Sequence, residues 1–278
     1  MHSVPDCQAI TKKAIVERLK KAYEEKGWLN ETGAKYPVEV AIHKDNVLLT
    51  IDTSGSGLNK RGYRLAQGEA PIKETLAASL IRLANWKGDS PLIDPFCGSG
   101  TIAIEACLIA QNIAPGFNRD FVSEEWNIMP PNIYDELRDE ADRMADYDKE
   151  IEVYASDIDP EMVEIAKRNA EEVGLGDIIQ FNVKDVNTLT IDSEGPVALV
   201  GNPPYGERIG DREEVEEMYR YIGSLMKQHP YLSTYILTSN KEFEYLVNRK
   251  ATKRRKLFNG YIECTYYQYW GKKPDFKN

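Results

Sequence analysis

The stretch from Pro91 to Thr101 constrains the fold more than any other part of the sequence, and it reads Pro-Leu-Ile-Asp-Pro-Phe-Cys-Gly-Ser-Gly-Thr. Leu92 and Ile93 predict a short buried strand. Gly98 and Gly100 predict a tight turn into a helix, because glycine adopts backbone conformations that other residues resist. Open α/β sheets bind ligands at the carboxyl ends of their strands, where the next helix offers free N–H groups. The sequence therefore predicts an open α/β sheet with a ligand site at this turn.

A second polar loop, Asn202-Pro-Pro-Tyr205, lies about 100 residues downstream, after the apolar run 196–200 that predicts another strand. Asn202 offers an amide oxygen, Pro203 a carbonyl whose direction the stiff backbone fixes, and Tyr205 an aromatic face. Such a loop suits a flat molecule that carries an amino group. Alone it would most often be an ordinary turn, and the glycine turn upstream is what favours a catalytic interpretation.

Composition excludes several classes of protein. The 278 residues contain neither a signal-peptide pattern nor an apolar run long enough to cross a bilayer, which predicts a cytoplasmic protein without a membrane partner. The four cysteines include no CxxC pair, so neither a metal site nor a disulfide framework is expected. Cys97 adjoins the glycine turn, where packing is favoured over a nucleophilic role. Nothing in the sequence indicates the oligomeric state.

The formal net charge of −10 is unevenly distributed. Residues 119–177 contain 19 acidic and 6 basic side chains, whereas residues 249–278 contain 9 basic and 2 acidic ones. Screening confines the field of surface charges to about 8–10 Å, so the sign near a binding face matters more than the total. The acidic balance does not exclude a nucleic-acid partner.

The remaining periodicity predicts the elements around the two loops. Residues 10–26 read as an amphipathic helix, and 38–42 with 47–51 read as a hairpin. Strands are predicted at 151–156, 178–183 and 233–238, with a final strand at 261–270 that pairs antiparallel at the end of the sheet. Residues 115–150 read as an insertion that ends in an acidic helix.

These motifs together resemble the THUMP-containing ribosomal RNA guanine-N2 methyltransferases, which are class I enzymes that use S-adenosylmethionine. The resemblance rests on Asp94–Thr101 and on Asn202-Pro-Pro-Tyr-Gly-Glu-Arg208, preceded by 60–64 and 70–75. It implies a Rossmann-like, seven-stranded α/β sheet with an antiparallel final strand, spanning residues 71–278. Residues 56–70 would form a linker and pocket-edge loop. Asn-Pro-Pro-Tyr alone is shared with adenine-N6 and glutamine-N5 enzymes.

Residues 1–55 are similar to the C-terminal part of a THUMP domain, which is an RNA-binding α+β module. The similarity rests on residues 3–8 and on the lysine-rich helix that follows them. One helix and two strands are too few to cover their own apolar faces. We therefore expect the first half of the module to lie upstream of Met1, with a small natural extension as the alternative.

The expected cofactor is S-adenosylmethionine. A carboxylate just past the second strand is placed to accept both ribose hydroxyls, which indicates Asp157. Gly98 and Gly100 would let the backbone meet the methionine part, and Asp94 would orient it. By resemblance, Asp185 accepts from the adenine amino group and Val186 lines the ring, although Asp185 also suits a simple turn. The other expected cofactor residues are Phe96, Thr101, Ile158 and Asn202, and the expected catalytic residues are Asn202, Pro203 and Tyr205.

RNA, most readily ribosomal RNA, is the expected partner. Basic side chains cluster at three places, in the helix 12–21, in the loop 60–64 and in the run 253–256. Each cluster alone would more often be a solvated surface. Their joint presence beside a base-modifying site favours RNA contact. Methylation of guanine N2 in transfer RNA and a non-catalytic role in ribosome assembly remain alternatives. The expected RNA-binding residues are Lys60, Arg61, Arg64, Lys253, Arg254, Arg255 and Lys256.

Overall fold

The computed structural model describes residues 3–65, 71–205 and 211–273. The chain divides into two compact units. The first comprises Met1–Leu58 and Asp120–Leu137, and the second comprises Asn59–Arg119 and Arg138–Asn278. The sequence placed all of 71–278 in one domain, whereas the structure groups 120–137 with the N-terminal residues. Gly206 to Arg208 of the second motif lie outside the described residues.

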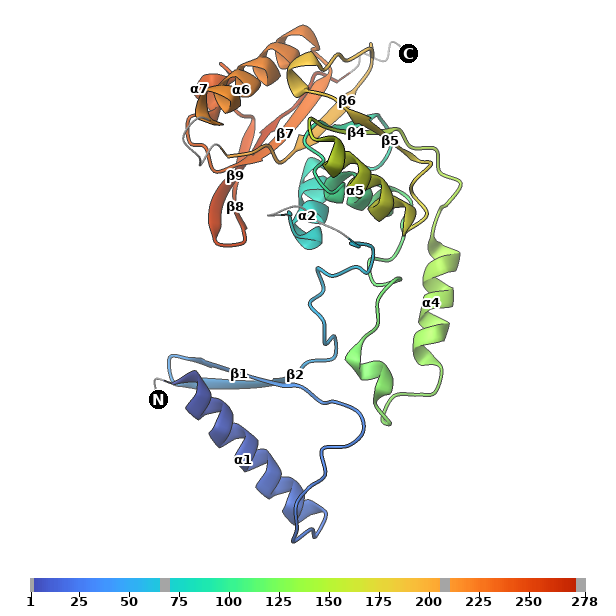
Figure 1. Ribbon diagram of the computed structural model, residues 1–278, viewed down its shortest axis with the longest axis vertical. Helices are drawn as coiled ribbons and strands as arrows, with labels where there is room; N and C mark the ends of the chain where they lie inside the picture. The colour runs from blue at the N-terminus through green and yellow to red at the C-terminus, as the bar shows by residue number, and fades with distance from the viewer. Residues whose placement is uncertain (1–2, 66–70, 206–210, 274–278) are drawn as a thin grey trace. The chain divides into compact units, whose positions relative to one another are not determined.

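The described N-terminal residues of the first unit form a helix and a hairpin, shown in blue in Figure 1. Helix α1 spans Val4–Ala22, and strands β1 (Val38–His43) and β2 (Asn46–Ile51) pair antiparallel. The predicted hairpin is confirmed. The helix begins earlier than periodicity indicated, because the Ser3 hydroxyl accepts from the Asp6 N–H and a proline occupies the first turn. Neither α1 nor the hairpin contains a fully buried side chain.

Residues 120–137 pack on this first unit through an aromatic contact. The Trp126 ring stacks on Tyr36 with centroids 4.6 Å apart, and its indole N–H donates to the Lys35 carbonyl over 2.7 Å. The Ser123 hydroxyl donates to the Thr53 carbonyl over 2.8 Å. A short 3-10 helix, η1 (Val122–Glu125), carries Ser123, and helix α4 (Ile133–Met144) follows. The apolar part of the predicted insertion therefore serves as packing for the N-terminal residues.

The second unit is built on a seven-stranded sheet, which confirms the predicted fold class. The strand order is β5-β4-β3-β6-β7-β9-β8. The first five run parallel, β9 is antiparallel to β7, and β8 is antiparallel to β9. The basic run 253–256 is the start of the edge strand β8. The strands are β3 (Leu92–Asp94), β4 (Val153–Asp157), β5 (Ile179–Val183), β6 (Val197–Gly201), β7 (Leu232–Thr238), β8 (Lys253–Asn259) and β9 (Ile262–Tyr269).

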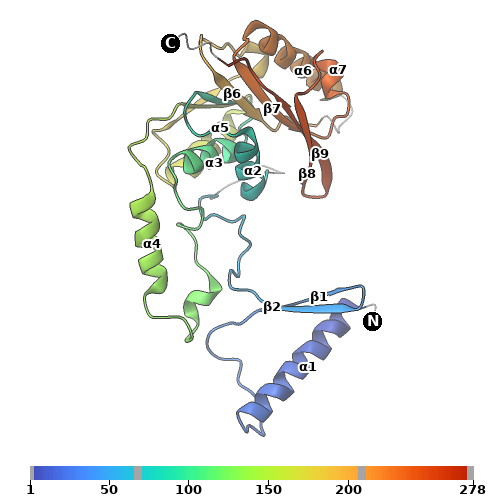
Figure 2. The same ribbon diagram turned by 180° about the vertical axis from the view of Figure 1, so that it is seen from behind.

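Helices cover both faces of this sheet (Figures 1 and 2). One buried cluster joins the sheet to α2 (Glu74–Ala84), α3 (Thr101–Ala110) and α5 (Pro160–Glu171). The other joins it to α6 (Asp211–Gln228) and α7 (Phe243–Leu246). Strand β6 is buried along its whole length and is continuously apolar, as expected for a strand that is covered on both faces. The parallel strands β3, β4 and β6 end at one edge, which brings distant parts of the sequence together.

Candidate active site

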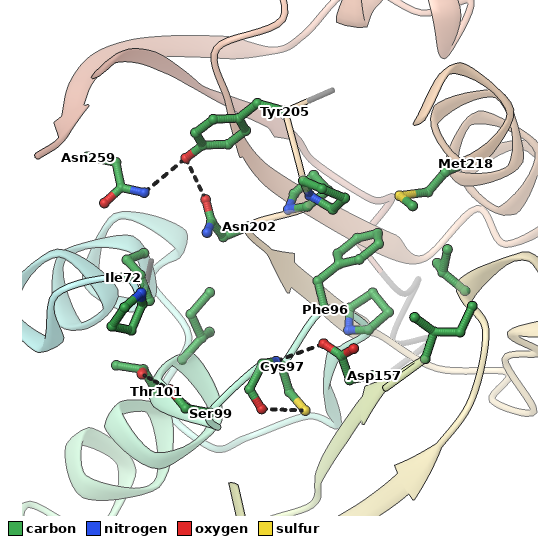
Figure 3. Close-up of a pocket in the computed structure, with 18 of the residues that line it drawn as sticks. Ile72, Phe96, Cys97, Ser99, Thr101, Asp157, Asn202, Tyr205, Met218 and Asn259 are labelled. Atoms are coloured by element: carbon green, nitrogen blue, oxygen red, sulfur yellow. Dashed lines mark hydrogen bonds between the residues drawn. The ribbon is translucent and has the colours of Figure 1, made fainter. Parts of the chain in front are cut away.

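A cavity of about 610 Å³ lies at the carboxyl edge of the parallel strands in the second unit. The loops after β3, β4, β5 and β6 all contribute to its wall, together with the end of β8 and the start of β9. Figure 3 shows that Phe96, Asp157, Asn202 and Tyr205 lie around one space. The structure thus brings both sequence motifs to a single cavity, as their positions after neighbouring strands predicted.

The two glycines of the turn do different things. Gly98 has φ +49°, its N–H donates to Asp157 Oδ2 over 2.9 Å, and a Cβ added there would meet nothing within 4 Å. Gly100 has φ +83° and caps α3, and a Cβ there would lie 3.0 Å from the Ala166 Cβ. Gly98 lines the cavity and Gly100 does not. Gly100 is required because the start of α3 lies close to Ala166 on α5. Gly98 has no side chain, so its backbone borders the open space directly.

Asp94 lies behind the wall of the cavity and is completely buried. Its Oδ1 accepts the Phe96 N–H over 3.2 Å, whereas Oδ2 has no hydrogen-bond partner among the described residues. Burial raises its pKa from 3.8 to about 8, and the nearby Asp157 charge acts in the same direction. A polar atom buried without a partner is costly, which marks this carboxyl as a group that a ligand could satisfy.

The carboxylates after β4 and β5 both line the cavity and both bond to their own backbone. Besides Gly98, Asp157 accepts the Asp159 N–H over 3.1 Å. Asp185 Oδ1 accepts the Asn187 N–H over 2.9 Å and caps the 3-10 helix η2 (Val186–Thr188), as a turn aspartate would. Ile158 and Val186 lie beside them on the wall. Asp159 caps α5 by accepting the Glu161 N–H.

The side chains of the Asn-Pro-Pro-Tyr loop are linked by hydrogen bonds. The Tyr205 hydroxyl donates to Asn202 Oδ1 over 2.7 Å and accepts from Asn259 Nδ2 over 3.2 Å. The Cys264 thiol lies 3.5 Å from the same hydroxyl. Burial raises the pKa of Tyr205, so the phenol stays protonated and remains a donor at neutral pH. Figure 3 shows Asn202 and Asn259 converging on this hydroxyl from separate elements.

Two arginines of the basic loop before α2 form ion pairs inside the protein. Arg61 Nε lies 3.3 Å from Glu105 Oε1, and Arg64 Nε lies 2.9 Å from Glu74 Oε1. Both guanidinium side chains are 13% exposed. Arg64 also donates to the Thr101 hydroxyl over 2.9 Å, which ties this loop to the start of α3. Carboxylates buried in the protein therefore engage both groups, and contact of Arg61 and Arg64 with RNA stays a prediction.

The other predicted basic residues lie on the surface. Lys60 is exposed, and the four at the start of β8 are exposed as well. Arg254 pairs with Glu244 on α7, and Lys256 pairs with Glu263 on β9. Within the described part of the chain, neither Lys253 nor Arg255 has a carboxylate partner.

Cys97 lines the cavity but is buried, and burial raises the pKa of its thiol, which disfavours the thiolate that a nucleophile requires. This agrees with the packing role predicted from sequence. No group of three or more metal-ligating side chains is arranged around a common point in the residues that the structure describes. Of the helices described, none is both long and apolar enough to span a bilayer.

Sequence reasoning missed several residues of the wall. Asn259 and Ile262 come from the β8–β9 hairpin, Met218 from α6, and Lys184 follows β5. The Asn259-Gly260 dipeptide is a strong signal for a hairpin turn, and it could have been used to predict the strand β8 before it. It would not have shown that this hairpin borders the cavity, because that follows from the position of β9 between β7 and β8.

Comparison with protein families and solved structures agrees with this architecture. The family UPF0020, described as "RMKL-like, methyltransferase domain", matches residues 61–268, and the THUMP domain family matches residues 1–52. The structure of SMU.472, solved in complex with S-adenosylhomocysteine, has a TM-score of 0.93 at 42% identity, covering 99% of this chain and 72% of that one. A structure from Listeria monocytogenes, titled a "predicted N6-adenine-specific DNA methylase", has a TM-score of 0.92 at 53% identity, covering 98% and 70%.

Two curated relatives extend the comparison. "Putative RNA methyltransferase YpsC" of Bacillus subtilis is 57% identical over 271 residues, which is 97% of this chain and 70% of the relative. Ribosomal RNA large subunit methyltransferase K/L of Shewanella baltica is 38% identical over 261 residues, so this chain spans only 37% of that enzyme's length. The glycine turn, the sheet order and these matches together show that the chain belongs to the RMKL-like family of S-adenosylmethionine-dependent methyltransferases, and that its N-terminal residues match the THUMP domain family.

Proposed function

We propose that this chain transfers a methyl group from S-adenosylmethionine to the exocyclic N2 of a guanine in large-subunit ribosomal RNA. The observation that carries the proposal is the shared cavity of Gly98, Asp157 and Asn202, in which a cofactor turn and an amide acceptor face one space. The names of the curated relatives support RNA as the substrate class. The proposed module boundaries are those predicted from sequence, 1–55, 56–70 and 71–278, with 120–137 packed on the first unit.

The cavity wall fits S-adenosylmethionine. Asp157 keeps lone pairs for ribose hydroxyls beyond its two backbone bonds, and the partnerless Oδ2 of Asp94 lies behind the glycine turn. The open space beside Gly98 admits a ligand against the backbone. Asp185 and Val186 would hold the adenine, with Ile158, Phe96 and Thr101 completing the wall. When bound, the cofactor supplies an electrophilic methyl group on a cationic sulfur.

The Asn202 side chain and the Pro203 carbonyl would hold the two hydrogens of the guanine amine. That nitrogen is a weak nucleophile, because its lone pair is delocalised into the ring. Two fixed acceptors favour a pyramidal nitrogen with its lone pair directed at the methyl group, and they stabilise the positive charge that develops there. These two acceptors would hold the nitrogen while its lone pair displaces the methyl group from the sulfonium sulfur, which keeps the S–C bonding electrons, and until the nitrogen loses a proton to solvent. The ring of Tyr205 would orient the base by stacking.

Tritiated S-adenosylmethionine tests the proposal. The 278-residue chain is incubated with unmodified 23S RNA transcribed in vitro, and the RNA is digested to nucleosides and separated. We expect label in N2-methylguanosine. Label in N6-methyladenosine would reject the guanine assignment and would move the target to adenine N6, the position named for the similar Listeria monocytogenes protein.

Two controls separate the alternatives. Transfer RNA replaces ribosomal RNA in a parallel reaction, and preferential labelling of transfer RNA would move the substrate to that class. The Asn202→Ala variant provides the background. RNA binding without transfer to either substrate would support a non-catalytic assembly role instead.

A further inference from the structure

The β8–β9 hairpin ends beside the cavity. Asn259 pairs with Ile262 across the hairpin, which leaves Gly260 and Tyr261 as a two-residue turn with Gly260 at φ +63°. Asn259 and Ile262 both line the cavity. Tyr261 is fully exposed at the tip, although tyrosine normally covers much of its ring. An aromatic side chain is therefore presented to solvent one residue from the cavity wall.

Strand alternation sorts the four basic residues of β8 onto two faces. Leu257 packs against the buried cluster that contains Cys264, and Asn259 reaches the cavity, so the odd-numbered residues face that side. Arg255 shares this face and lies about 13 Å along the strand from Asn259. Arg254 and Lys256 lie on the opposite face, where they pair with Glu244 and Glu263.

We propose that this hairpin is the platform for the RNA strand next to the modified base, with Tyr261 stacked on a neighbouring base and Arg255 paired with a phosphate. The inference rests on the proposed function, because a base that enters the cavity must first leave its helix or loop. Its neighbours then expose unstacked faces, and an aromatic ring recovers about 1–3 kcal/mol per base. The guanidinium fork of arginine matches phosphate geometry. Positive charge and continuity with the cavity favour RNA over a protein partner.

The affinity of the full chain for RNA tests the stacking role. A fluorescein-labelled single-stranded RNA oligonucleotide of mixed sequence is titrated in the presence of S-adenosylhomocysteine and followed by anisotropy. We expect Tyr261→Ala to weaken binding about five- to a hundredfold, the range that corresponds to the loss of one stacked base. Tyr261→Trp should bind as well as wild type. Tyr245→Ala removes another highly exposed tyrosine, on α7, and should change nothing.

Salt dependence tests the phosphate contact. Arg255→Gln should reduce the slope of log affinity against log salt by about one, whereas Lys227→Gln, which removes an exposed positive charge from α6, should leave it unchanged. Calorimetric titration with S-adenosylhomocysteine confirms that each variant is folded. Wild-type affinity in Tyr261→Ala, or equal slopes in the two charge variants, would overturn the inference.

The two proposals fail separately. Normal methylation of guanine N2 with no dependence on Tyr261 would reject the platform and leave the proposed function standing. RNA binding that depends on Tyr261 without transfer to guanine would reject the proposed function and keep the platform.

Discussion

The Tyr205 hydroxyl donates to Asn202 Oδ1 over 2.7 Å, so the first and last residues of the Asn-Pro-Pro-Tyr loop are bonded to one another. Asn259 donates to the same hydroxyl. Because a hydroxyl has a single proton, the relay runs in one direction and turns the oxygen of the Asn202 amide, rather than its nitrogen, toward Tyr205. That oxygen has a second lone pair, which remains available to an amine in the cavity.

Asn202→Ala should lower the turnover number by about 10²-fold, because one preorganised acceptor is lost from the transition state. The affinity for S-adenosylhomocysteine, measured by calorimetry, should change little. Asn202→Asp keeps an acceptor oxygen and should retain more activity than the alanine variant. Full turnover in Asn202→Ala would show that this amide does not hold the amine.

Tyr205→Phe should lower the turnover number by about three- to tenfold, since it removes one hydrogen bond that positions Asn202 and keeps the ring. Tyr205→Ala should in addition raise the KM for RNA, because the stacking face is lost. Asn259→Ala should match the phenylalanine variant, and combining the two should add no further loss. Additive losses would indicate that Asn259 acts separately from the Tyr205 hydroxyl.

The fold and the main site follow from local signals, whereas the accessory residues follow from tertiary packing. The stretches 92–101 and 202–205 both contribute residues to the cavity, as predicted, because the carboxyl ends of parallel strands share an edge. The cofactor and catalytic roles assigned to them stay predictions. Asn259 was missed, since its approach to the cavity depends on β9 inserting between two strands. Trp126 was read as part of an insertion, and its partner Tyr36 lies 90 residues away in the sequence.

Arg61 and Arg64 illustrate the limit of charge patterns. A basic loop that is exposed to solvent and one whose side chains form buried ion pairs can have the same composition. Only the positions of the acidic partners distinguish the two cases. Here the partners are Glu105 on α3, where every other residue except Thr101 is apolar, and Glu74, which is buried in the first turn of α2. A carboxylate inside an otherwise apolar helix face is a signal that a buried cation lies opposite.

Gly98→Ala and Gly100→Ala should have different consequences. Both glycines have positive φ, which costs other residues about 1–2 kcal/mol. At Gly100 the added Cβ also meets Ala166 at 3.0 Å, so the thermal midpoint should fall further. At Gly98 the Cβ enters open space beside the cavity, and cofactor affinity should fall instead.

Gly174→Ala is the control for the backbone cost alone, since Gly174 has φ +69° with nothing within 4 Å and lies off the cavity wall. Thermal unfolding and calorimetry on the three variants separate the effects. Equal cofactor affinity in the Gly98 and Gly174 variants would contradict the placement of the cofactor at this turn.

Arg64→Ala should destabilise the second unit by about 3–5 kcal/mol, because it leaves Glu74 buried without its partner. Lys60→Ala, a change on the same loop at an exposed position, should have little effect on stability. Urea unfolding of both variants checks this. Wild-type stability in Arg64→Ala combined with weaker RNA binding would instead support the predicted RNA contact of this arginine.

Asp94 should make the protein without cofactor less stable as pH rises. The pKa of its carboxyl is 3.8 in the unfolded reference and about 8 in the fold, mainly because the group is buried. Between these values the unfolded chain has lost the proton that the folded chain retains, so the free energy of unfolding falls as pH increases through this window.

Asp94→Asn resembles the protonated form and removes this contribution. Urea unfolding at several pH values should therefore give a shallower decline for Asp94→Asn than for wild type, with Asp177→Asn as the same chemical change at an exposed position. Parallel profiles for wild type and Asp94→Asn would mean that the buried carboxyl is ionised throughout, in which case another buried group must supply its counter-charge.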